Sequence, residues 1–348
     1  MRAVVVGAGG TTSVVDVPVP RPGPGEVLLR LRGCGLCGTD LYKLEHDLVP
    51  PGTVLGHEIV GTAVAIGAGV DSVAPGQRVV APHHVACGSC RLCGTGSDTR
   101  CPLFTGENLM VPGGFAEYVL LRSRVVERAL WLPPDRVSDE AASMMEPAAC
   151  VLRGLLRGRA SGSGDGGVLA VVGGGGMGLL HVLVLRAFAP RAMVVVSDPI
   201  ANRRELARGL GARAGVSPDE LADTVRDLSA GTGADAVFDT VGGPEVFRQA
   251  LGVLRPGGSA VLFAHAGAGV RADFVLDPFF RAEQRVVATY SGGLAEQRLV
   301  AEAITDGRLD PAPLVTRRLP LERFGEAVDL ARGRRELKVL LVPAAGAT

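Results

Sequence analysis

Four cysteines that lie close together in the chain are the first residues whose spacing suggests chemistry. Cys87, Cys90, Cys93 and Cys101 have the spacing C-x2-C-x2-C-x7-C. Four thiolates suit a tetrahedral ion, and zinc bound by four sulfurs is usually structural because no position is left for a substrate. The spacing could also serve an iron–sulfur cluster, a zinc ribbon that contacts nucleic acid, or disulfides. We expect a structural zinc ion in a lobe over residues 87–101.

A glycine-rich segment follows the apolar run 168–172 and precedes an apolar helix. Gly173, Gly175 and Gly178 match G-x-G-x-x-G in the strand–turn–helix setting that this motif requires. The first glycine allows a tight turn, the second lets the backbone approach a pyrophosphate, and the third lets the helix pack on the sheet. With Gly176 and Met177, they predict a dinucleotide site; a purely structural turn is the alternative.

An acidic residue closes the next expected strand. Asp198 lies about twenty residues past the glycine loop, where a carboxylate can accept hydrogen bonds from an adenosine ribose. A carboxylate there would repel a 2′-phosphate. The sequence therefore favours NAD over NADP, although Arg203 and Arg204 nearby weigh against a strict preference.

Four dispersed residues, Cys37, His57, Glu58 and Glu146, could also bind a metal. Each has an ordinary explanation, because a lone cysteine is usually a small buried side chain and a lone histidine usually forms structural hydrogen bonds. Cys34 and Cys37 form a C-x-x-C, but no thioredoxin-like pattern surrounds this potential redox pair. The residues alone leave these interpretations open.

The order of the motifs resembles that of the zinc-containing medium-chain dehydrogenases, especially the sorbitol and threonine dehydrogenase branch. The resemblance runs nearly from end to end, and its motifs are the opening strand, Cys37-Gly38-Thr39-Asp40, Gly56-His57-Glu58, the four-cysteine lobe, Gly113-Gly114-Phe115-Ala116-Glu117-Tyr118, Glu146-Pro147 and the glycine loop. It implies an α/β chain with a β-rich GroES-like catalytic domain and a Rossmann domain with a doubly wound parallel sheet.

The resemblance also implies a ligand set for a catalytic zinc ion: Cys37, His57 and a carboxylate. That carboxylate would be Glu146, with Glu58 behind the ligands or exchanging with a water. Such a mixed set leaves one position for the substrate. Asp198 and Arg203 match the pair that binds the ribose in this branch.

A proton relay is implied as well. Thr39, two residues after Cys37, would hydrogen-bond the substrate hydroxyl and pass its proton on through the cofactor ribose; a turn-stabilising hydroxyl is the alternative. A histidine often stands five residues after this cysteine, but here that residue is Tyr42. His46 is therefore our candidate for the end of the relay, with direct release to solvent as the alternative.

Two patterns of elements must position these residues. The first 150 residues contain short runs rich in β-branched residues and cut by Gly and Pro, which predict strands; these are Val4–Val6, Val27–Leu31, Val54–Ile66, Val79–Val80 and Phe115–Leu121. A helix over Asp139–Leu156 follows, and strands and helices then alternate, which predicts a parallel sheet; these are strands Val168–Val172, Met193–Ser197, Ala236–Asp239, Val261–Ala264 and Val286–Ala288, and helices Met177–Phe188 and Arg203–Leu210. We expect a catalytic domain over 1–150 and 290–348, the latter with a helix near Glu296–Thr305 and a strand at Val339–Val342, and an NAD-binding domain over 151–289.

The composition of the chain limits the classes of molecule that it is expected to bind. The 348 residues carry 36 basic and 36 acidic side chains, and this neutral balance argues against nucleic acid or an anionic membrane as a partner. Only two basic residues are lysines, Lys43 and Lys338, a bias that by itself says little about mechanism. No apolar run of about 18 residues exists, so we expect no membrane span. We expect a cytoplasmic protein, and the resemblance implies a homo-oligomer, a dimer or tetramer.

These observations predict a zinc-dependent oxidoreductase that transfers hydride from a secondary alcohol to NAD+. Its small-molecule substrate would be a polyol, a sugar, a cyclitol or an amino alcohol. One alternative is an NADPH-dependent enone or quinone reductase of the same fold. The other is a non-enzymatic protein that senses nucleotides or interacts through a zinc ribbon.

Overall fold

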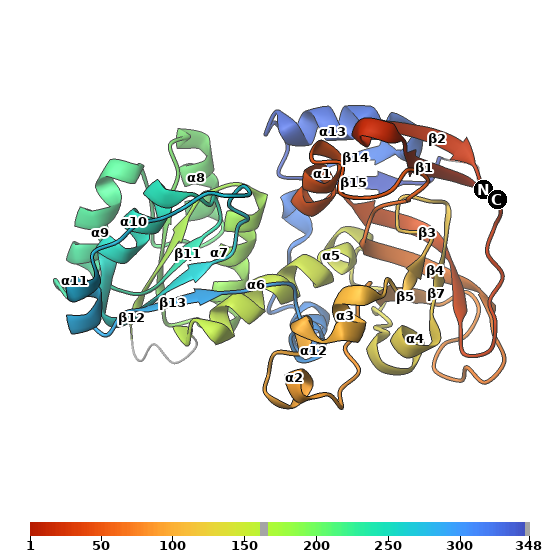
Figure 1. The fold of residues 1–348 in the computed structure, drawn as a ribbon, viewed down its shortest axis with the longest axis horizontal. Helices are drawn as coiled ribbons and strands as arrows, with labels where there is room; N and C mark the ends of the chain where they lie inside the picture. The colour runs from red at the N-terminus through yellow and green to blue at the C-terminus, as the bar shows by residue number, and fades with distance from the viewer. Residues whose placement is uncertain (161–165, 345–348) are drawn as a thin grey trace. The chain divides into compact units, whose positions relative to one another are not determined.

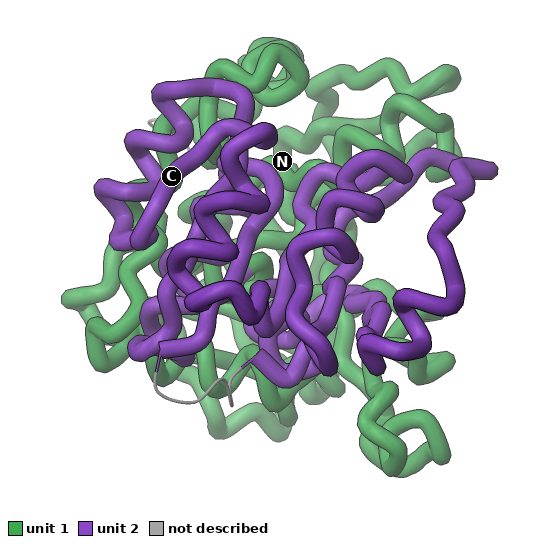
Figure 2. The backbone as a smooth tube through the Cα atoms, turned by 90° about the vertical axis from the view of Figure 1, so that its left-hand side faces the viewer, with its two compact units in different colours: residues 1–147, 293–348 green, residues 148–292 purple. Residues whose placement is uncertain are grey.

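The computed structural model describes residues 1–160 and 166–344. The chain forms two compact units, one of Met1–Pro147 with Gly293–Thr348 (unit 1) and one of Ala148–Gly292 (unit 2) (Figure 2). Among the described residues, no helix has the length and apolar character needed to cross a membrane.

Unit 1 is built on a seven-stranded sheet (Figure 1). Its strands run in the order β14 (Val315–Pro320), β15 (Lys338–Val342), β3 (Val27–Gly35), β4 (Glu58–Ile66) and β5 (Arg78–Ala81), and β7 (Tyr118–Leu121) pairs with both β3 and β6 (Met110–Val111). All of these pairs are antiparallel except β14 with β15. A separate hairpin joins β1 (Arg2–Val6) to β2 (Thr12–Asp16).

Alternating side chains of these strands form one core, in which Leu29, Ile59, Phe115 and Leu341 are almost fully buried. The sheet is surrounded by mostly short helices, whose bounds are α1 (Gly38–Glu45), α2 (Arg91–Gly94), α3 (Pro102–Gly106), α4 (Ser123–Ala129), α5 (Asp139–Ser143), α12 (Leu294–Thr305) and α13 (Phe324–Arg332). Short 3-10 turns lie at Ala8–Gly10, Asp98–Arg100, Ala312–Leu314 and Leu321–Arg323.

Unit 2 contains a six-stranded parallel sheet. Its strand order is β10 (Ala214–Val216), β9 (Met193–Ser197), β8 (Val168–Val172), β11 (Ala234–Asp239), β12 (Leu254–Leu262) and β13 (Arg285–Ala288). The other elements are α6 (Met145–Arg157), which begins in unit 1, and α7 (Gly176–Phe188), α8 (Ala201–Gly209), α9 (Leu221–Leu228), α10 (Pro244–Val253) and α11 (Leu276–Arg281), with a 3-10 turn at Pro218–Glu220. The order reverses between β8 and β11, and a ligand of such a sheet binds at the carboxyl ends of the strands at that point.

The fold class predicted from the sequence is confirmed, and three of the local differences concern segments that carry predicted site residues. The run Val54–Ile66 becomes a strand only from Glu58, because Gly56 has a left-handed φ of +93° that interrupts extended backbone. The expected helix Asp139–Leu156 divides at Met144 into α5 and α6. Helix α1 was not expected at all.

Candidate active site and metal centres

Three of the predicted metal ligands lie together in unit 1. Ligand atoms of Cys37, His57 and Glu58 all lie within 4.8 Å of one another. Cys37 follows β3 and is the N-cap of α1, while His57 and Glu58 lie at the start of β4. Antiparallel pairing sets Gly35 opposite Glu58, so the end of one strand meets the beginning of the next. The sheet register thus brings together residues about twenty positions apart in sequence.

Asp40 orients two members of this group. One carboxylate oxygen accepts a hydrogen bond from the Cys37 backbone N–H at 3.1 Å, and the other lies 3.4 Å from Nδ1 of His57. Asp40 is fully buried; burial raises the pKa of its carboxyl, but the charge and hydrogen bond of His57 outweigh it, and the pKa is lowered. A carboxylate on Nδ1 leaves Nε2 of His57 free to bind a metal and fixes the ring.

The group is suited to a cation. Burial lowers the pKa of His57, but the charges of Asp40 and Cys37 outweigh it, so the pKa lies well above its ordinary value. Surroundings that attract a proton this strongly also favour a divalent cation. Thiolate, imidazole and carboxylate are donors that zinc accepts, and three protein ligands leave a fourth position open. The residues present therefore fit a catalytic zinc ion.

Glu58 is paired with one of the two lysines of the chain. Both of its carboxylate oxygens lie 2.7 Å from Nζ of Lys338, which also donates to the carbonyl of Leu36 at 3.3 Å. Lys338 and Glu58 are both buried. Burial lowers the pKa of Lys338, but the charges of Glu58 and Cys37 outweigh it and raise the pKa, so the side chain is an ammonium ion. Lys338 thereby balances negative charge beside the candidate metal site.

Glu146, the carboxylate that the resemblance implies as the zinc ligand, is buried in the first turn of α6 but is not a member of this group. Its charge is one of the causes that raise the pKa of Lys338, which indicates that it lies near the same lysine. Glu58 is the carboxylate that lies with Cys37 and His57. The role of Glu146 as a direct ligand stays a prediction.

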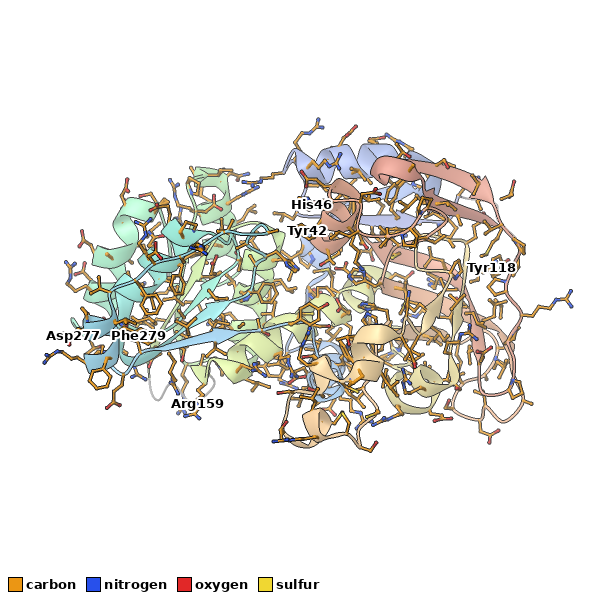
Figure 3. All side chains as sticks on the ribbon, in the orientation of Figure 1. Tyr42, His46, Tyr118, Arg159, Asp277 and Phe279 are labelled. Carbon is orange, nitrogen blue, oxygen red and sulfur yellow. The ribbon has the colours of Figure 1, made fainter. Side chains whose placement is uncertain are left out.

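The residues of the predicted proton relay lie along α1. The backbone N–H of Thr39 donates to Sγ of Cys37 at 3.4 Å, which sets Thr39 beside the candidate metal ligands. His46 caps the other end of α1, is exposed, and packs edge-on against Tyr42 with ring centroids 4.3 Å apart (Figure 3). The catalytic roles of Thr39, Glu58 and His46 stay predictions.

Two histidines beside His57 were missed in the sequence. The ring of His83 lies 4.6 Å from that of His57 and 3.9 Å from that of His84, whose Nδ1 lies 2.7 Å from the carbonyl of Glu107. Burial lowers the pKa of His83 and of His84, so both are neutral imidazoles near pH 7. Asp40 and Lys338 were missed too. The rarity of lysine was a signal for Lys338, but nothing in its sequence neighbourhood indicates a partner.

The four cysteines of the lobe also lie together. Ligand atoms of Cys87, Cys90, Cys93 and Cys101 are within 4.8 Å of one another, and all are free thiols. Hydrogen bonds from Ser89 and from the backbone N–H of Cys90 lower the pKa of Cys87 to about 5, which favours the thiolate that zinc binds. The guanidinium of Arg128 donates to the carbonyls of Ala86 and Cys87 and ties the lobe to α4.

The glycine loop of unit 2 has the geometry of a tight turn into a helix. Gly173 has a φ of +100°, and a Cβ on Gly178 would lie 1.7 Å from the carbonyl oxygen of Gly173, so only glycine fits at either position. Gly175 is the N-cap of α7, which begins with Gly176 and Met177. The first backbone N–H groups of this helix are donors suited to a phosphate.

Asp198 lies beside this loop. Its carboxylate oxygens accept hydrogen bonds from the backbone of Gly174 at 2.7 Å and of Ile200 at 2.8 Å. Nη1 of Arg203 lies 3.6 Å from the same carboxylate. The structure thus brings together the residues predicted to bind the cofactor, at the carboxyl ends of β8 and β9. Their binding roles stay predictions.

Comparison with known proteins identifies the family. The family model described as the alcohol dehydrogenase GroES-like domain matches residues 23–131, and the model described as zinc-binding dehydrogenase matches residues 176–306. The L-threonine 3-dehydrogenase of Pyrococcus horikoshii is 30% identical over 342 residues, which are 96% of either chain. The chain belongs to the zinc-binding medium-chain dehydrogenases.

Solved structures of this family agree. The alcohol dehydrogenase TADH from Thermus sp. ATN1 is 31% identical, with a TM-score of 0.85 over 99% of this chain and 100% of that one. A zinc-binding dehydrogenase from Sinorhizobium meliloti bound to NADP is 30% identical, with a TM-score of 0.86 over 98% of this chain and 99% of that one. The predicted fold, a GroES-like domain with a Rossmann domain, and the predicted cofactors, zinc and a nicotinamide dinucleotide, are confirmed for this zinc-binding dehydrogenase. It is an alcohol oxidoreductase.

Proposed function

We propose that this dehydrogenase oxidises a secondary alcohol to a ketone and transfers the hydride to NAD+. The balanced reaction is R2CH–OH + NAD+ → R2C=O + NADH + H+. The observation that carries the proposal is the mixed group of Cys37, His57 and Glu58, whose donors suit zinc and leave a position for the substrate oxygen.

The chain's own residues have separate tasks in this reaction. A zinc ion held by Cys37, His57 and a glutamate would supply a Lewis acid that lowers the pKa of the alcohol hydroxyl. Asp40 fixes the imidazole of His57, and Lys338 balances the charge of Glu58. Thr39, beside Cys37, would accept a hydrogen bond from the substrate hydroxyl and hold its proton.

The proposed preference is for NAD over NADP. Asp198 presents its carboxylate beside the glycine loop, and the backbone N–H groups of Gly174 and Ile200 hold its two oxygens in place. A 2′-phosphate there would meet this negative charge, and Arg203, near the same carboxylate, weakens the repulsion only in part. Replacing Asp198 by Ala should raise the ratio of NADP+ to NAD+ activity; an unchanged ratio would mean that another residue sets the preference.

The proposed substrates are amino alcohols and polyols. Curated relatives that are 30% identical over almost the whole chain are named L-threonine 3-dehydrogenases, so threonine is the first candidate. A reductase of enones or quinones with this fold is the competing function. It would leave the group of Cys37, His57 and Glu58 without a purpose, because hydride addition to an activated alkene does not require a metal.

A screen of wild-type enzyme over secondary alcohols with NAD+, followed as NADH absorbance, tests the proposal. Enones with NADPH form the second arm. We expect turnover with at least one alcohol and none with the enones. Turnover confined to the enone arm would support the competing reductase instead.

A further inference from the structure

Both lysines of the chain belong to unit 1 and lie near the candidate zinc site. The sequence has 36 basic residues, and all but Lys43 and Lys338 are arginines. Lys338 forms an ion pair with Glu58, and its Nζ lies 2.7 Å from both carboxylate oxygens. Lys43 lies in α1, the helix that carries Thr39 and Asp40, and its side chain is half-buried.

Helical geometry sets Lys43 on the side of α1 that faces the zinc ligands. It follows Asp40 by three residues and Thr39 by four, so it shares a helix face with both. Asp40 is fully buried against His57, and the backbone N–H of Thr39 donates a hydrogen bond to Sγ of Cys37. Lys43 therefore lies one turn, about 6 Å along the axis, beyond the residue expected to hold the substrate hydroxyl.

Among the described residues, Lys43 has no carboxylate partner. Within residues 1–160 and 166–344, no ion pair includes its ammonium, and the nearby carboxylate of Asp40 is already bound to His57 and to the backbone of Cys37 and Gly56. After burial and the neighbouring histidines, the charge of Lys43 also helps to lower the pKa of His83 and of His84. Because Coulomb interactions weaken with distance, this cation lies within electrostatic reach of both histidines.

One of these histidines has a polar atom that lacks a partner among the described residues. Nδ1 of His83 is buried and makes no hydrogen bond to any described residue, although its ring lies 4.6 Å from that of His57. A neutral imidazole can donate or accept one hydrogen bond. Among the described residues, α1 thus carries an ammonium without an ion pair, and a ring nitrogen without a partner lies next to His57.

We propose that the substrate of this dehydrogenase is an anionic secondary alcohol, with a carboxylate or phosphate a few bonds from the reacting hydroxyl, and that Lys43 binds this anion. The proposal rests on the proposed function and narrows its substrate class. Thr39 and the metal would bind the hydroxyl of the substrate. Lys43, one helical turn away, would bind its carboxylate or phosphate. His83 is available to hydrogen-bond a group between them.

A structural role for Lys43 gives a different expectation. A cation in the last turn of a helix interacts favourably with the helix dipole, and it would do so whichever substrate is bound. That role changes the stability of α1 and affects charged and neutral substrates alike. The ratio of activities on matched substrates therefore separates the two roles.

The test uses steady-state kinetics with NAD+ on two matched pairs of alcohols. Sorbitol 6-phosphate is paired with sorbitol, and 3-hydroxybutyrate with 2-butanol, so the arms distinguish phosphate from carboxylate. The enzymes are wild type, Lys43→Met, Lys43→Arg and Arg21→Met, the last a control that removes an exposed cation elsewhere in unit 1. Thermal unfolding by circular dichroism confirms that each variant folds.

In wild type we expect a higher kcat/KM for the charged member of at least one pair. In Lys43→Met the charged-to-neutral ratio should fall 10- to 100-fold through KM, with partial recovery in Lys43→Arg and no change in Arg21→Met. Turnover of neutral alcohols with the same ratio in wild type and Lys43→Met would overturn the role of Lys43 and leave the proposed function intact. Absence of turnover with every alcohol would overturn both.

Discussion

Asp40 holds two candidate ligands at once, since its carboxylate joins the backbone of Cys37 to the ring of His57. Loss of such a hydrogen bond behind a metal ligand typically costs 10- to 100-fold in metal affinity or activity. We therefore expect Asp40→Asn to lower zinc affinity or kcat by about that factor. Asp47→Asn makes the same chemical change at an exposed residue just beyond α1 and should have no such effect, as zinc titration and NADH kinetics would show.

Lys338 and Glu58 form a buried ion pair, and a buried charge that loses its partner is costly. Lys338→Met should therefore destabilise the protein by about 3–5 kcal/mol in urea denaturation. Adding Glu58→Gln should recover most of this loss, because no unpaired charge is then left. If the two changes destabilise additively, the pair does not act as a unit.

Single residues were predictable where a motif carries them. Cys37, His57 and Glu58 stand in short motifs of distinctive order, and the structure brings them together. Lys338 could not be found in this way, because only the pairing of β15 with β3 brings it to Glu58, 280 positions earlier. His83 and His84 precede the four-cysteine lobe, but only the fold shows that they stack beside His57.

Helix α7 carries a buried histidine that should make stability depend on pH. His181 is fully buried between Phe238 and Phe263, its Nδ1 lies 2.7 Å from the carbonyl of Met177, and burial lowers its pKa from 6.5 to about 4. Between these values the unfolded chain binds the proton and the folded chain does not. The contribution of neutral His181 to the free energy of unfolding is therefore fully present above pH 6.5, and about 3 kcal/mol of it is lost as the pH drops towards 4.

Replacement of the side chain isolates this effect. His181→Gln should flatten the decline of the unfolding free energy between pH 6.5 and 4, measured by urea denaturation at a series of pH values. His265→Gln, at an exposed histidine of the same unit, is the control and should keep the decline. Identical profiles for His181→Gln and wild type would mean that other groups cause it.

Elements were predictable where local pattern and fold agree. The apolar runs of unit 2 became parallel strands because strands buried on both faces are apolar throughout, as in β8. Helix α1 was missed because its N-cap is Cys37, an unusual capping residue, and its first residue is a glycine. The most important helix of the site is thus the one with the weakest local signal.

At the scale of the whole molecule, the predicted homo-oligomer stays a prediction. Exposed apolar side chains gather before β13, the edge strand of the unit 2 sheet: Val275 is 73%, Leu276 71% and Phe280 78% exposed, on or beside α11, which Figure 3 marks with Asp277 and Phe279. Open strand edges with apolar neighbours favour pairing with a second copy. Light scattering should show a dimer or tetramer, and Phe280→Glu should shift it towards monomer; a monomeric wild type would contradict the prediction.

The zinc content of the purified chain, measured by mass spectrometry of the metal, tests the central claim most directly. Wild type should hold two zinc ions per chain, one for each cluster. Cys37→Ala should retain the fold and one zinc ion, that of the four-cysteine lobe, and should lose NAD+ reduction. A wild type with only the lobe zinc, or a Cys37→Ala variant with two zinc ions and full turnover, would contradict the account.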